Sequence, residues 1–231
     1  MIVGSMVVKN EADRYLQASL TRLKEVCDQV FVFDDNSTDG SVEIAEQLGC
    51  AVFTNPGYAP TFLEDESSFR QSAWNIMGGE FLLDGDDWVI SVDADEYFVG
   101  DADELIEYNS YYDSLRLHIQ EVWSLDPLMI RTDGFWNQNR NLRIARYSGN
   151  LKFNDKKMGC GSIPEGYAFP NSRSILKIFH FGYAEEADRQ ARYSRYKSLP
   201  DHGHNPKHID SIITQPTLAE IHGVDFWRGV R

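Results

Sequence analysis

Short apolar runs alternate with amphipathic segments along the first hundred residues of the chain. Runs with the length and β-branched content of buried strands lie at Ile2–Val8, Gln29–Phe33, Ala51–Thr54 and Trp88–Val92. Apolar residues at helical spacing predict helices at Glu11–Val26, Ser41–Leu48 and Asp65–Met77. Asn10 is the expected N-cap of the first helix, and Gly49 is the expected C-cap of the second. This order predicts an α/β fold with a mostly parallel sheet flanked by helices.

The pattern becomes less regular after Glu96. Residues 124–175 are rich in Gly, Asn, Pro and Arg, and we expect strands and long loops around a functional site there. The tail from Leu199 predicts a loop before a last helical piece. The other elements predicted in this half are strands at Ser114–Trp123 and Ile175–Phe181 and helices at Asp103–Tyr108 and Glu185–Lys197.

Composition limits the classes of function. The 231 residues suffice for one large domain or two small ones, and the 42% hydrophobic content is typical of a protein with a buried core. The net charge of -14 argues against a simple electrostatic grip on nucleic acid or an anionic membrane. An anionic substrate must therefore be met locally by a metal ion or by arginines.

The widely spaced Cys27, Cys50 and Cys160 fit neither a disulfide framework nor a zinc site, so we expect buried free thiols in a reducing compartment. No segment approaches the length of a transmembrane helix, and no basic region precedes the first apolar run. These features predict a cytoplasmic protein.

The apolar run that begins at Trp88 ends in three carboxylates, Asp93, Asp95 and Glu96. Ligands of open α/β sheets bind outside the carboxyl ends of the strands. Because Asp93 and Asp95 are two residues apart, their side chains would point the same way on an extended chain. Two such carboxylates suit a hard divalent cation, Mg²⁺ or Mn²⁺. The alternative interpretation is a solvated acidic loop.

Two earlier strands also run into polar residues. Asp34 and Asp35 follow the second strand, where a carboxylate can accept a hydrogen bond from a base N–H or a ribose hydroxyl; turn chemistry is the alternative. Lys9 and Glu11 follow the first strand and would line the same crevice, or form a solvated pair. The glycine patterns of Rossmann dinucleotide sites and of P-loops do not follow this strand.

Four stretches together carry a family resemblance. They are Val8-Lys9-Asn10-Glu11, Asp34 to Ser41, Phe69 to Asn75 and Trp88 to Glu96. In order and spacing, they resemble the family 2 glycosyltransferases of GT-A fold, and most of all the bacterial lipopolysaccharide-core type. The resemblance implies metal-dependent, inverting transfer of a sugar from a nucleoside-diphosphate sugar, above all a UDP-sugar, to a hydroxyl of a glycan or another biomolecule. It covers residues 1–100, which would form the nucleotide-sugar-binding half of a single GT-A domain, with residues 101–231 as its loop-rich acceptor-binding half.

The resemblance also implies roles for individual residues. Glu11 and Asp35 would hold the nucleoside, and Asp93 would approach both the ribose and the metal. Arg70 would lie near the donor phosphates or sugar, with a surface arginine as the alternative. Asp95 would ligate Mn²⁺ or Mg²⁺, which neutralises the diphosphate as a Lewis acid does. The full sets implied are Val8, Glu11, Asp35, Arg70, Asp93 and Ala94 for the donor, and Asp93, Asp95 and His180 for the metal.

His180 matches the family's later histidine-containing stretch, although a packed core histidine is the alternative. His202, His204 and His208 would belong to a lid or a plain surface, or one of them would supply the metal ligand instead. Arg140, Arg143 and Arg146 are spaced three apart and would reach phosphates or form a solvated basic face.

Inverting transfer needs a general base that deprotonates the acceptor hydroxyl. Glu165 lies where the lipopolysaccharide-type relatives place a His-Glu pair, and this chain has Pro164 at the histidine position. We take Glu165 as the first candidate and Asp133 as the second, with an ordinary loop acid as the alternative for each.

Two other functions remain open from the sequence. A sugar nucleotidyltransferase of the same fold would need a glycine-rich basic loop after the first strand, which Lys9-Asn10-Glu11 does not provide. A non-catalytic carbohydrate- or nucleotide-binding module is the other alternative, and the pair Asp93 and Asp95 argues against it. A hydroxylated nucleic-acid base is conceivable as an acceptor, although the net charge disfavours it.

Overall fold

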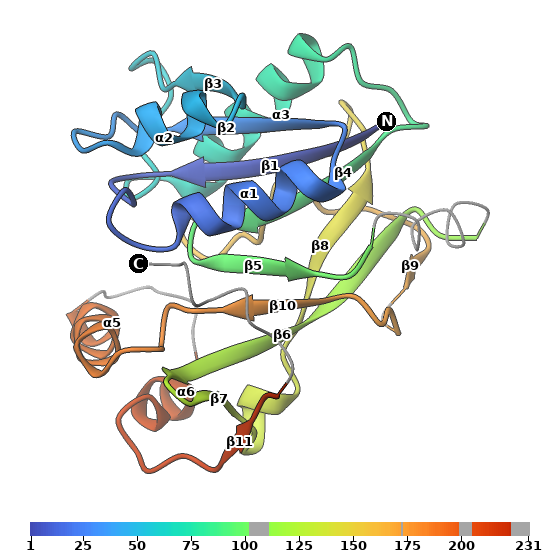
Figure 1. The fold of residues 1–231 in the computed structure, drawn as a ribbon. Coiled ribbons are helices and arrows are strands. Elements are labelled where there is room, and N and C mark those ends of the chain that lie inside the picture. The colour runs from blue at the N-terminus through green and yellow to red at the C-terminus, as the bar shows by residue number, and fades with distance from the viewer. Residues whose placement is uncertain (102–110, 172, 199–204, 223–231) are drawn as a thin grey trace.

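The computed structural model describes residues 1–101, 111–171, 173–198 and 205–222. The helix predicted at Asp103–Tyr108 lies outside these residues. The first half contains β1 (Ile2–Val8), α1 (Leu16–Val26), β2 (Gln29–Asp34), α2 (Ser41–Gln47), β3 (Ala51–Thr54), α3 (Glu66–Glu80), β4 (Trp88–Asp93) and β5 (Glu96–Val99) (Figure 1). The second half contains β6 (Ser114–Leu125), β7 (Leu128–Arg131), the 3-10 helix η1 (Gly134–Asn137), β8 (Arg140–Arg146), β9 (Pro170–Asn171), β10 (Lys177–His180), α5 (Glu186–Ser198), α6 (Pro206–Ser211) and β11 (Leu218–Glu220).

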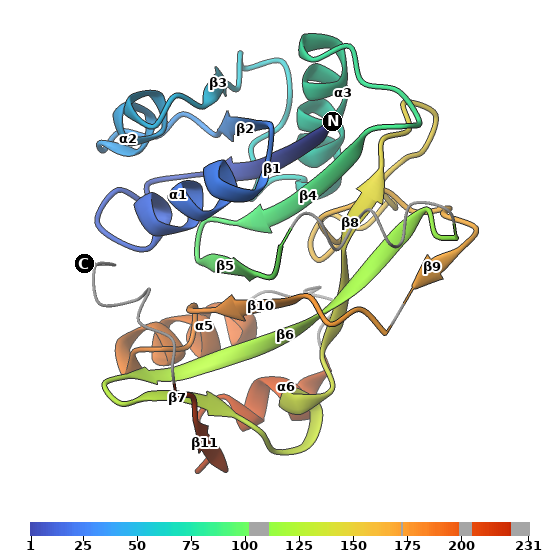
Figure 2. The same ribbon diagram turned by 45° about the vertical axis from the view of Figure 1, so that its right-hand side comes forward.

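A single sheet runs through both halves, and the order of its main path is β11-β7-β6-β8-β4-β1-β2-β3. The strands β3, β2, β1 and β4 are parallel, which confirms the predicted α/β fold. β8 pairs antiparallel with β4, and β10 lies between β5 and β6. Figure 2 shows β5, β10 and β6 side by side below the parallel strands. The second half therefore extends the sheet of the first.

Helices cover both faces of the parallel strands. Met6 and Val8 of β1 pack in the core beneath α1 and α2, whereas Val3 packs with Phe69 and Trp74 of α3 on the opposite face. This follows from the alternation of side chains along a strand. Each fully buried apolar side chain of this size contributes about 1.5–3 kcal/mol relative to an exposed one.

The first helix begins at Leu16 instead of the predicted Glu11. Asn10 has a φ of 54°, and its side-chain oxygen accepts a hydrogen bond of 2.8 Å from the Thr38 amide. The residue is therefore a contact between two loops and not an N-cap, so that prediction was wrong. Gly49, with a φ of 71°, follows the end of α2 in the left-handed conformation expected of a C-cap glycine.

The chain turns directly after β4 and returns as β5, a strand that the sequence pattern did not predict. Ala94 and Asp95 form the turn, and the Asp93 amide donates a hydrogen bond of 2.9 Å to the Glu96 carboxylate. The assumption of an extended chain from Asp93 to Asp95 was therefore wrong. The two carboxylates contact different partners, as described below.

The other strands and helices predicted from the sequence, apart from Asp103–Tyr108, lie close to observed elements.

Cys160 is buried, while Cys27 and Cys50 are half-buried, and all three are free thiols. Across the described ranges, no helix combines the length and the apolar character needed to cross a membrane.

Candidate active site

Three neighbouring parallel strands end at one level of the sheet. Val8, the last residue of β1, is aligned with Asp34 of β2, and Val7 is aligned with Asp93 of β4. The polar residues that follow these strands are thereby brought to one edge, as the sequence predicts for strand ends of a parallel sheet. In Figure 1 the tip of β1 points toward the side of the molecule where α5 lies.

Hydrogen bonds lock together the loops after β1 and β2. The Lys9 ammonium donates to the Asp35 carbonyl and, at 3.0 Å, to the Asn36 carbonyl. The Glu11 amide donates to the Ser41 hydroxyl at 2.8 Å. The Val8 side chain is buried, and its carbonyl accepts from the Asp35 amide at 2.8 Å. These contacts fix the backbone positions of Glu11 and Asp35 relative to each other.

Asp35 is buried at the end of β2. Its carboxylate accepts hydrogen bonds from the Asn55 side chain at 3.3 Å and from the Phe62 amide at 3.1 Å. The neighbouring Asp34 instead accepts from the Ser37 amide at 3.1 Å and so shapes the turn. Of this acidic pair, Asp34 therefore has the turn role and Asp35 faces the loop before α3.

Glu11 is a partly buried carboxyl group next to the other acids. Burial raises the pKa of Glu11 to about 7; Arg14 lowers it, and Asp95 raises it. Its Oε2 atom lies 3.6 Å from an Arg14 nitrogen, and it has no hydrogen-bond partner among the described residues. A buried acceptor of this kind is suited to a ligand hydroxyl.

Asp93 lies between two buried arginines. Arg70 donates to Asp93 at 2.8 Å, and an Arg143 nitrogen lies 3.5 Å from the other carboxylate oxygen. Burial alone would raise the pKa of Asp93, but these guanidinium groups hold it below its usual value. Arg70 also donates to Glu66 at 2.8 Å, and Arg143 to Glu96 at 2.5 Å. The carboxylate is thus ionised and oriented from both sides.

Asp95 contacts a second set of positive groups. Its Oδ2 atom lies 2.5 Å from Arg192 Nη2 and 3.3 Å from His180 Nε2. The other ring nitrogen of His180 lies 2.5 Å from the Glu121 carboxylate. Although burial opposes ionisation of Asp95, His180 and Arg192 hold its pKa well below the usual range. Burial lowers the pKa of His180, but Glu121 and Asp95 together raise it well above its ordinary value.

In donor type, the carboxylates of Asp93 and Asp95 fit a divalent cation, and His180 fits it once Nε2 has lost the proton that faces Asp95. Glu121 holds His180 by Nδ1, so that Nε2 faces Asp95, an arrangement by which carboxylates orient metal-binding histidines. The part of the chain that the structure describes contains no preformed group of three or more His, Cys, Asp or Glu side chains that could hold a metal ion. Arginines instead form ion pairs with both Asp93 and Asp95.

Arg70 and Ala94, two residues implied for the donor site, are both buried. Arg70 is not a surface arginine, and its guanidinium stacks 5.2 Å from the Phe62 ring centre. Ala94 is buried in the turn, and its carbonyl accepts from the Ser19 hydroxyl at 3.2 Å. In this structure Arg70 orients Asp93, and Ala94 supports the turn.

The two candidate bases have different surroundings. Glu165 is exposed, and its carboxylate accepts a hydrogen bond of 2.9 Å from Asn154. Asp133 binds Arg131 through both carboxylate oxygens, at 2.8 and 2.9 Å. The hydrogen bonds from Arg131 lower the pKa of Asp133. Asp133 is therefore a poor proton acceptor, and its partners lie in β7 and before β11.

The three arginines of β8 do not form one basic face. Arg143 is buried against Asp93, whereas Arg140 is exposed, as expected for strand residues an odd number apart. Arg146 lies 4.9 Å from the Trp88 ring centre. His208 packs 4.3 Å from the ring centre of Trp136, and His202 and His204 fall outside the described residues.

Sequence reasoning missed several charged residues of this cluster, among them Glu66 and Arg192. Glu66 is the i−4 neighbour of Arg70 on α3, which is a signal that helical spacing could have given. Arg192 has no such signal, because α5 also carries Arg189 and Arg195 at the same spacing. Only the tertiary structure shows which of them meets Asp95.

No protein-family model matches the chain. The chain is 36% identical over 109 residues to an uncharacterized glycosyltransferase of Rickettsia felis, a match that covers 46% of this chain and 33% of that protein. It is 35% identical over 109 residues to an uncharacterized glycosyltransferase of Rickettsia conorii, with the same two coverages. The aligned part thus spans about a third of the length of these curated relatives.

Solved structures give the fold. The crystal structure of S. aureus TarS matches with a TM-score of 0.52 and 15% identity, covering 92% of this chain and 42% of that one. The fold is that of the GT-A glycosyltransferases. TarS 1–349 in complex with UDP matches the chain with a TM-score of 0.50 and the same identity, covering 92% of this chain and 70% of that one. At this identity the similarity concerns the fold.

Proposed function

We propose that the chain is a metal-dependent family 2 glycosyltransferase that moves a sugar from a UDP-sugar to an acceptor hydroxyl with inversion. The observation that carries the proposal is the meeting of Glu11, Asp35, Asp93 and Asp95 at one edge of the sheet. The Rickettsia proteins named glycosyltransferases and the UDP complex of TarS support it. The UDP preference is carried over from that complex as part of the proposal.

Glu11 and Asp35 would hold the nucleoside. The Oε2 atom of Glu11 is a buried acceptor for a ribose hydroxyl, and the Asp35 carboxylate can accept from a base N–H. The hydrogen bonds between the two loops hold both groups in place before the donor binds. This arrangement lowers the ordering cost of binding.

Asp93, Asp95 and the Nε2 atom of His180 would hold Mn²⁺ or Mg²⁺. Either cation accepts carboxylate oxygens, so the donor set does not choose between them. When bound, the cation neutralises the diphosphate and so stabilises the leaving group. Arg70 and Arg143 orient Asp93, while Glu121 orients His180.

Glu165 is the favoured general base. In the proposed step, the acceptor oxygen forms a bond to the anomeric carbon, the bond from that carbon to the diphosphate oxygen breaks, and the hydroxyl proton passes to Glu165. Glu165 is exposed and therefore accessible to an acceptor, whereas the carboxylate of Asp133 is already paired with the Arg131 guanidinium. Glu165 lies on the same loop as Ser162, which contacts Arg143 and so connects this loop to Asp93.

The acceptor would be a glycan or another biomolecule that bears a hydroxyl group. The charge of -14 disfavours a nucleic-acid acceptor. Three free cysteines support a place in the reducing cytoplasm.

The test is a thermal-shift panel of UDP, GDP, CDP, dTDP and their common sugars, each with and without Mn²⁺. A ligand that binds the folded state raises its apparent stability by mass action, by about 2.7 kcal/mol at a hundred times its Kd. We expect one nucleoside diphosphate to stabilise the wild type only with Mn²⁺, and Asp95→Asn to lose this response. Asp86→Asn, which changes a fully exposed acid, should respond as the wild type does.

Release of UDP from the stabilising sugar nucleotide in the presence of Mn²⁺ would then measure catalysis. Stabilisation without any release of nucleoside diphosphate, even with acceptors supplied, would favour the non-catalytic module. Absence of a response to every nucleotide in folded protein would overturn the donor site.

A further inference from the structure

The Arg192 guanidinium contacts Asp95 and His180, two of the three side chains of the proposed metal site. Arg192 Nη2 is 2.5 Å from Asp95 Oδ2 and 3.5 Å from His180 Nε2. His180 Nε2 is itself 3.3 Å from the same carboxylate oxygen. One positively charged group of the protein therefore contacts two of the three groups proposed to hold a divalent cation.

The fold provides room for this guanidinium. A Cβ atom on Gly182 would lie 2.1 Å from Arg192 Nη2 and 2.6 Å from His180 Nε2. The absence of a side chain at residue 182 thus lets Arg192 and His180 meet. The Tyr183 ring supports the guanidinium, with its centre 5.0 Å from Arg192 Cζ. Arg192 therefore occupies a defined position, packed between Tyr183 and the space left by Gly182.

The helix that carries Arg192 is held by polar contacts and by Tyr193 and Tyr196, which pack against the buried cluster around Trp136. No residue of α5 is fully buried. Asp188 pairs with Arg14 at 3.1 Å, and Arg189 donates to the carbonyls of Trp123 and Tyr183. The side chain of Arg192 remains one-fifth exposed, at 20%. The polar contacts of Arg192 itself can therefore exchange for ligand contacts without moving the tyrosines of α5 out of this cluster.

We propose that Arg192 is an exchangeable counter-ion that holds Asp95, yields it to an incoming divalent cation and then pairs with the diphosphate of the nucleotide. This inference rests on the proposed function. A guanidinium and a divalent cation repel each other, so they do not share one carboxylate oxygen at low cost. Guanidinium groups bind phosphate oxygens in bidentate pairs, so the displaced side chain has a matching anionic partner.

The first experiment measures binding of Mn²⁺ alone, from the loss of the free-ion signal in electron paramagnetic resonance. Arg192→Met removes the charge and keeps much of the side-chain length, and we expect it to bind Mn²⁺ about tenfold tighter than the wild type. Arg192→Lys keeps a competing charge and should stay near the wild type. Arg195→Met, on an exposed residue of the same helix, is the matched control and should leave Mn²⁺ affinity unchanged.

The second experiment measures UDP and UMP binding by calorimetry with saturating Mn²⁺. We expect Arg192→Met to weaken UDP about tenfold and UMP less, because UMP lacks the second phosphate. Tighter metal binding together with weaker UDP binding is a pair of opposite changes that general damage to the fold does not produce. Arg192→Gln serves as a second neutral variant if the methionine variant does not fold.

The outcomes separate the two proposals. Mn²⁺ binding that is equal or weaker in the folded neutral variants would overturn the counter-ion role and leave the metal site standing. UDP affinity that is unchanged in these variants would also overturn it. If neither the wild type nor any variant binds Mn²⁺, the metal site of the proposed function fails, and the counter-ion role fails with it.

Discussion

The pKa of Glu11, at the edge of the sheet, is set by opposing effects of its surroundings. Burial and the nearby Asp95 favour its neutral form, whereas Arg14 favours the carboxylate. Burial prevails, and the pKa of Glu11 rises from 4.5 to about 7. Between these values the folded chain holds a proton that the unfolded chain has lost. Glu11 therefore makes the folded state less stable as pH rises through this range.

Substitution of Glu11 by Gln removes this ionisation and should change the pH dependence of stability. We expect the wild type and Glu11→Gln to have similar free energies of unfolding near pH 4. Above pH 7 the variant should be more stable, by at most about 3–4 kcal/mol if the full rise in the pKa of Glu11 acts on stability. Urea unfolding at a series of pH values would measure the difference, in which groups common to both proteins cancel.

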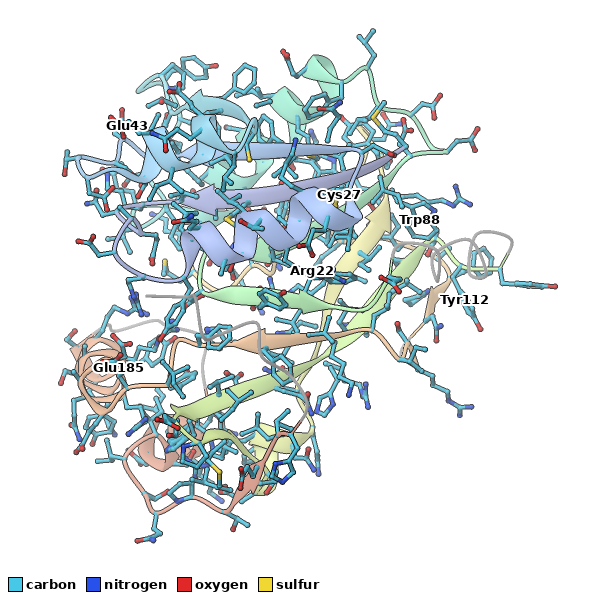
Figure 3. All side chains as sticks on the ribbon, in the orientation of Figure 1. Arg22, Cys27, Glu43, Trp88, Tyr112 and Glu185 are labelled. Atoms are coloured by element: carbon cyan, nitrogen blue, oxygen red, sulfur yellow. The ribbon has the colours of Figure 1, made fainter. Side chains whose placement is uncertain are left out.

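Glu43 offers a matched control for this experiment. It is an exposed acid on α2, labelled in Figure 3. Glu43→Gln should leave the shape of the pH profile as it is in the wild type. If the difference between wild type and Glu11→Gln does not vary with pH, burial does not govern the ionisation of Glu11.

Residues of the candidate site differ in how well the sequence predicts them. Asp35, Asp93 and Asp95 follow apolar runs directly, so their place at the strand ends could be predicted from local pattern. Their partners could not, because Arg143 and Arg192 come from β8 and α5, far along the chain. Local pattern carries no information on which long-range ion pair forms.

At the scale of elements, α3 offers two adjacent glycines in different surroundings. A Cβ on Gly78 would lie 1.8 Å from the Tyr147 hydroxyl, whereas a Cβ on Gly79 would meet nothing within 4 Å. The Tyr147 ring stacks on Trp74 with centres 5.3 Å apart. Gly78 therefore permits the close approach of Tyr147, the residue after β8, to α3, and Gly79 has no such role.

Alanine at each position should separate packing from helix propensity. Gly78→Ala must displace the Tyr147 ring, and we expect it to lower the free energy of unfolding by about 1–2 kcal/mol. Gly79→Ala removes a flexible residue from an exposed helical position and should raise that free energy by about 0.5–1 kcal/mol. Urea unfolding followed by circular dichroism measures both. Equal effects of the two substitutions would contradict the packing role of Gly78.

Elements of the parallel half could be predicted because buried parallel strands are continuous apolar runs. β5 could not be predicted in this way, because it has only four residues and begins at Glu96, directly after the turn of Ala94 and Asp95. The start of α1 was wrong for a related reason. Asn10 suits an N-cap and a loop contact equally well by type, and the bond to Thr38 decides between them.

At the scale of the whole molecule, the sheet and the ion pairs both cross from one half of the sequence to the other. β8 pairs with β4, and β10 pairs with β5. Arg143 of the second half contacts Asp93 of the first at 3.5 Å, and His180 lies 3.3 Å from Asp95. Loss of either half would leave buried charges of the other without their partners, which is strongly destabilising.

We therefore expect residues 1–100 and 101–231 to unfold as one unit. Native-state hydrogen exchange in increasing urea would measure this from amides of β2 and of β6, one strand from each half. The slowest amides of both strands should report the same free energy of opening and the same urea dependence, because both exchange only through global unfolding. α5 has no fully buried residue and should exchange at a lower free energy, which serves as an internal reference for local opening. If the slowest amides of β6 open about 2 kcal/mol more easily than those of β2, the halves are separate units, since such a gap means that one unfolds while the other persists.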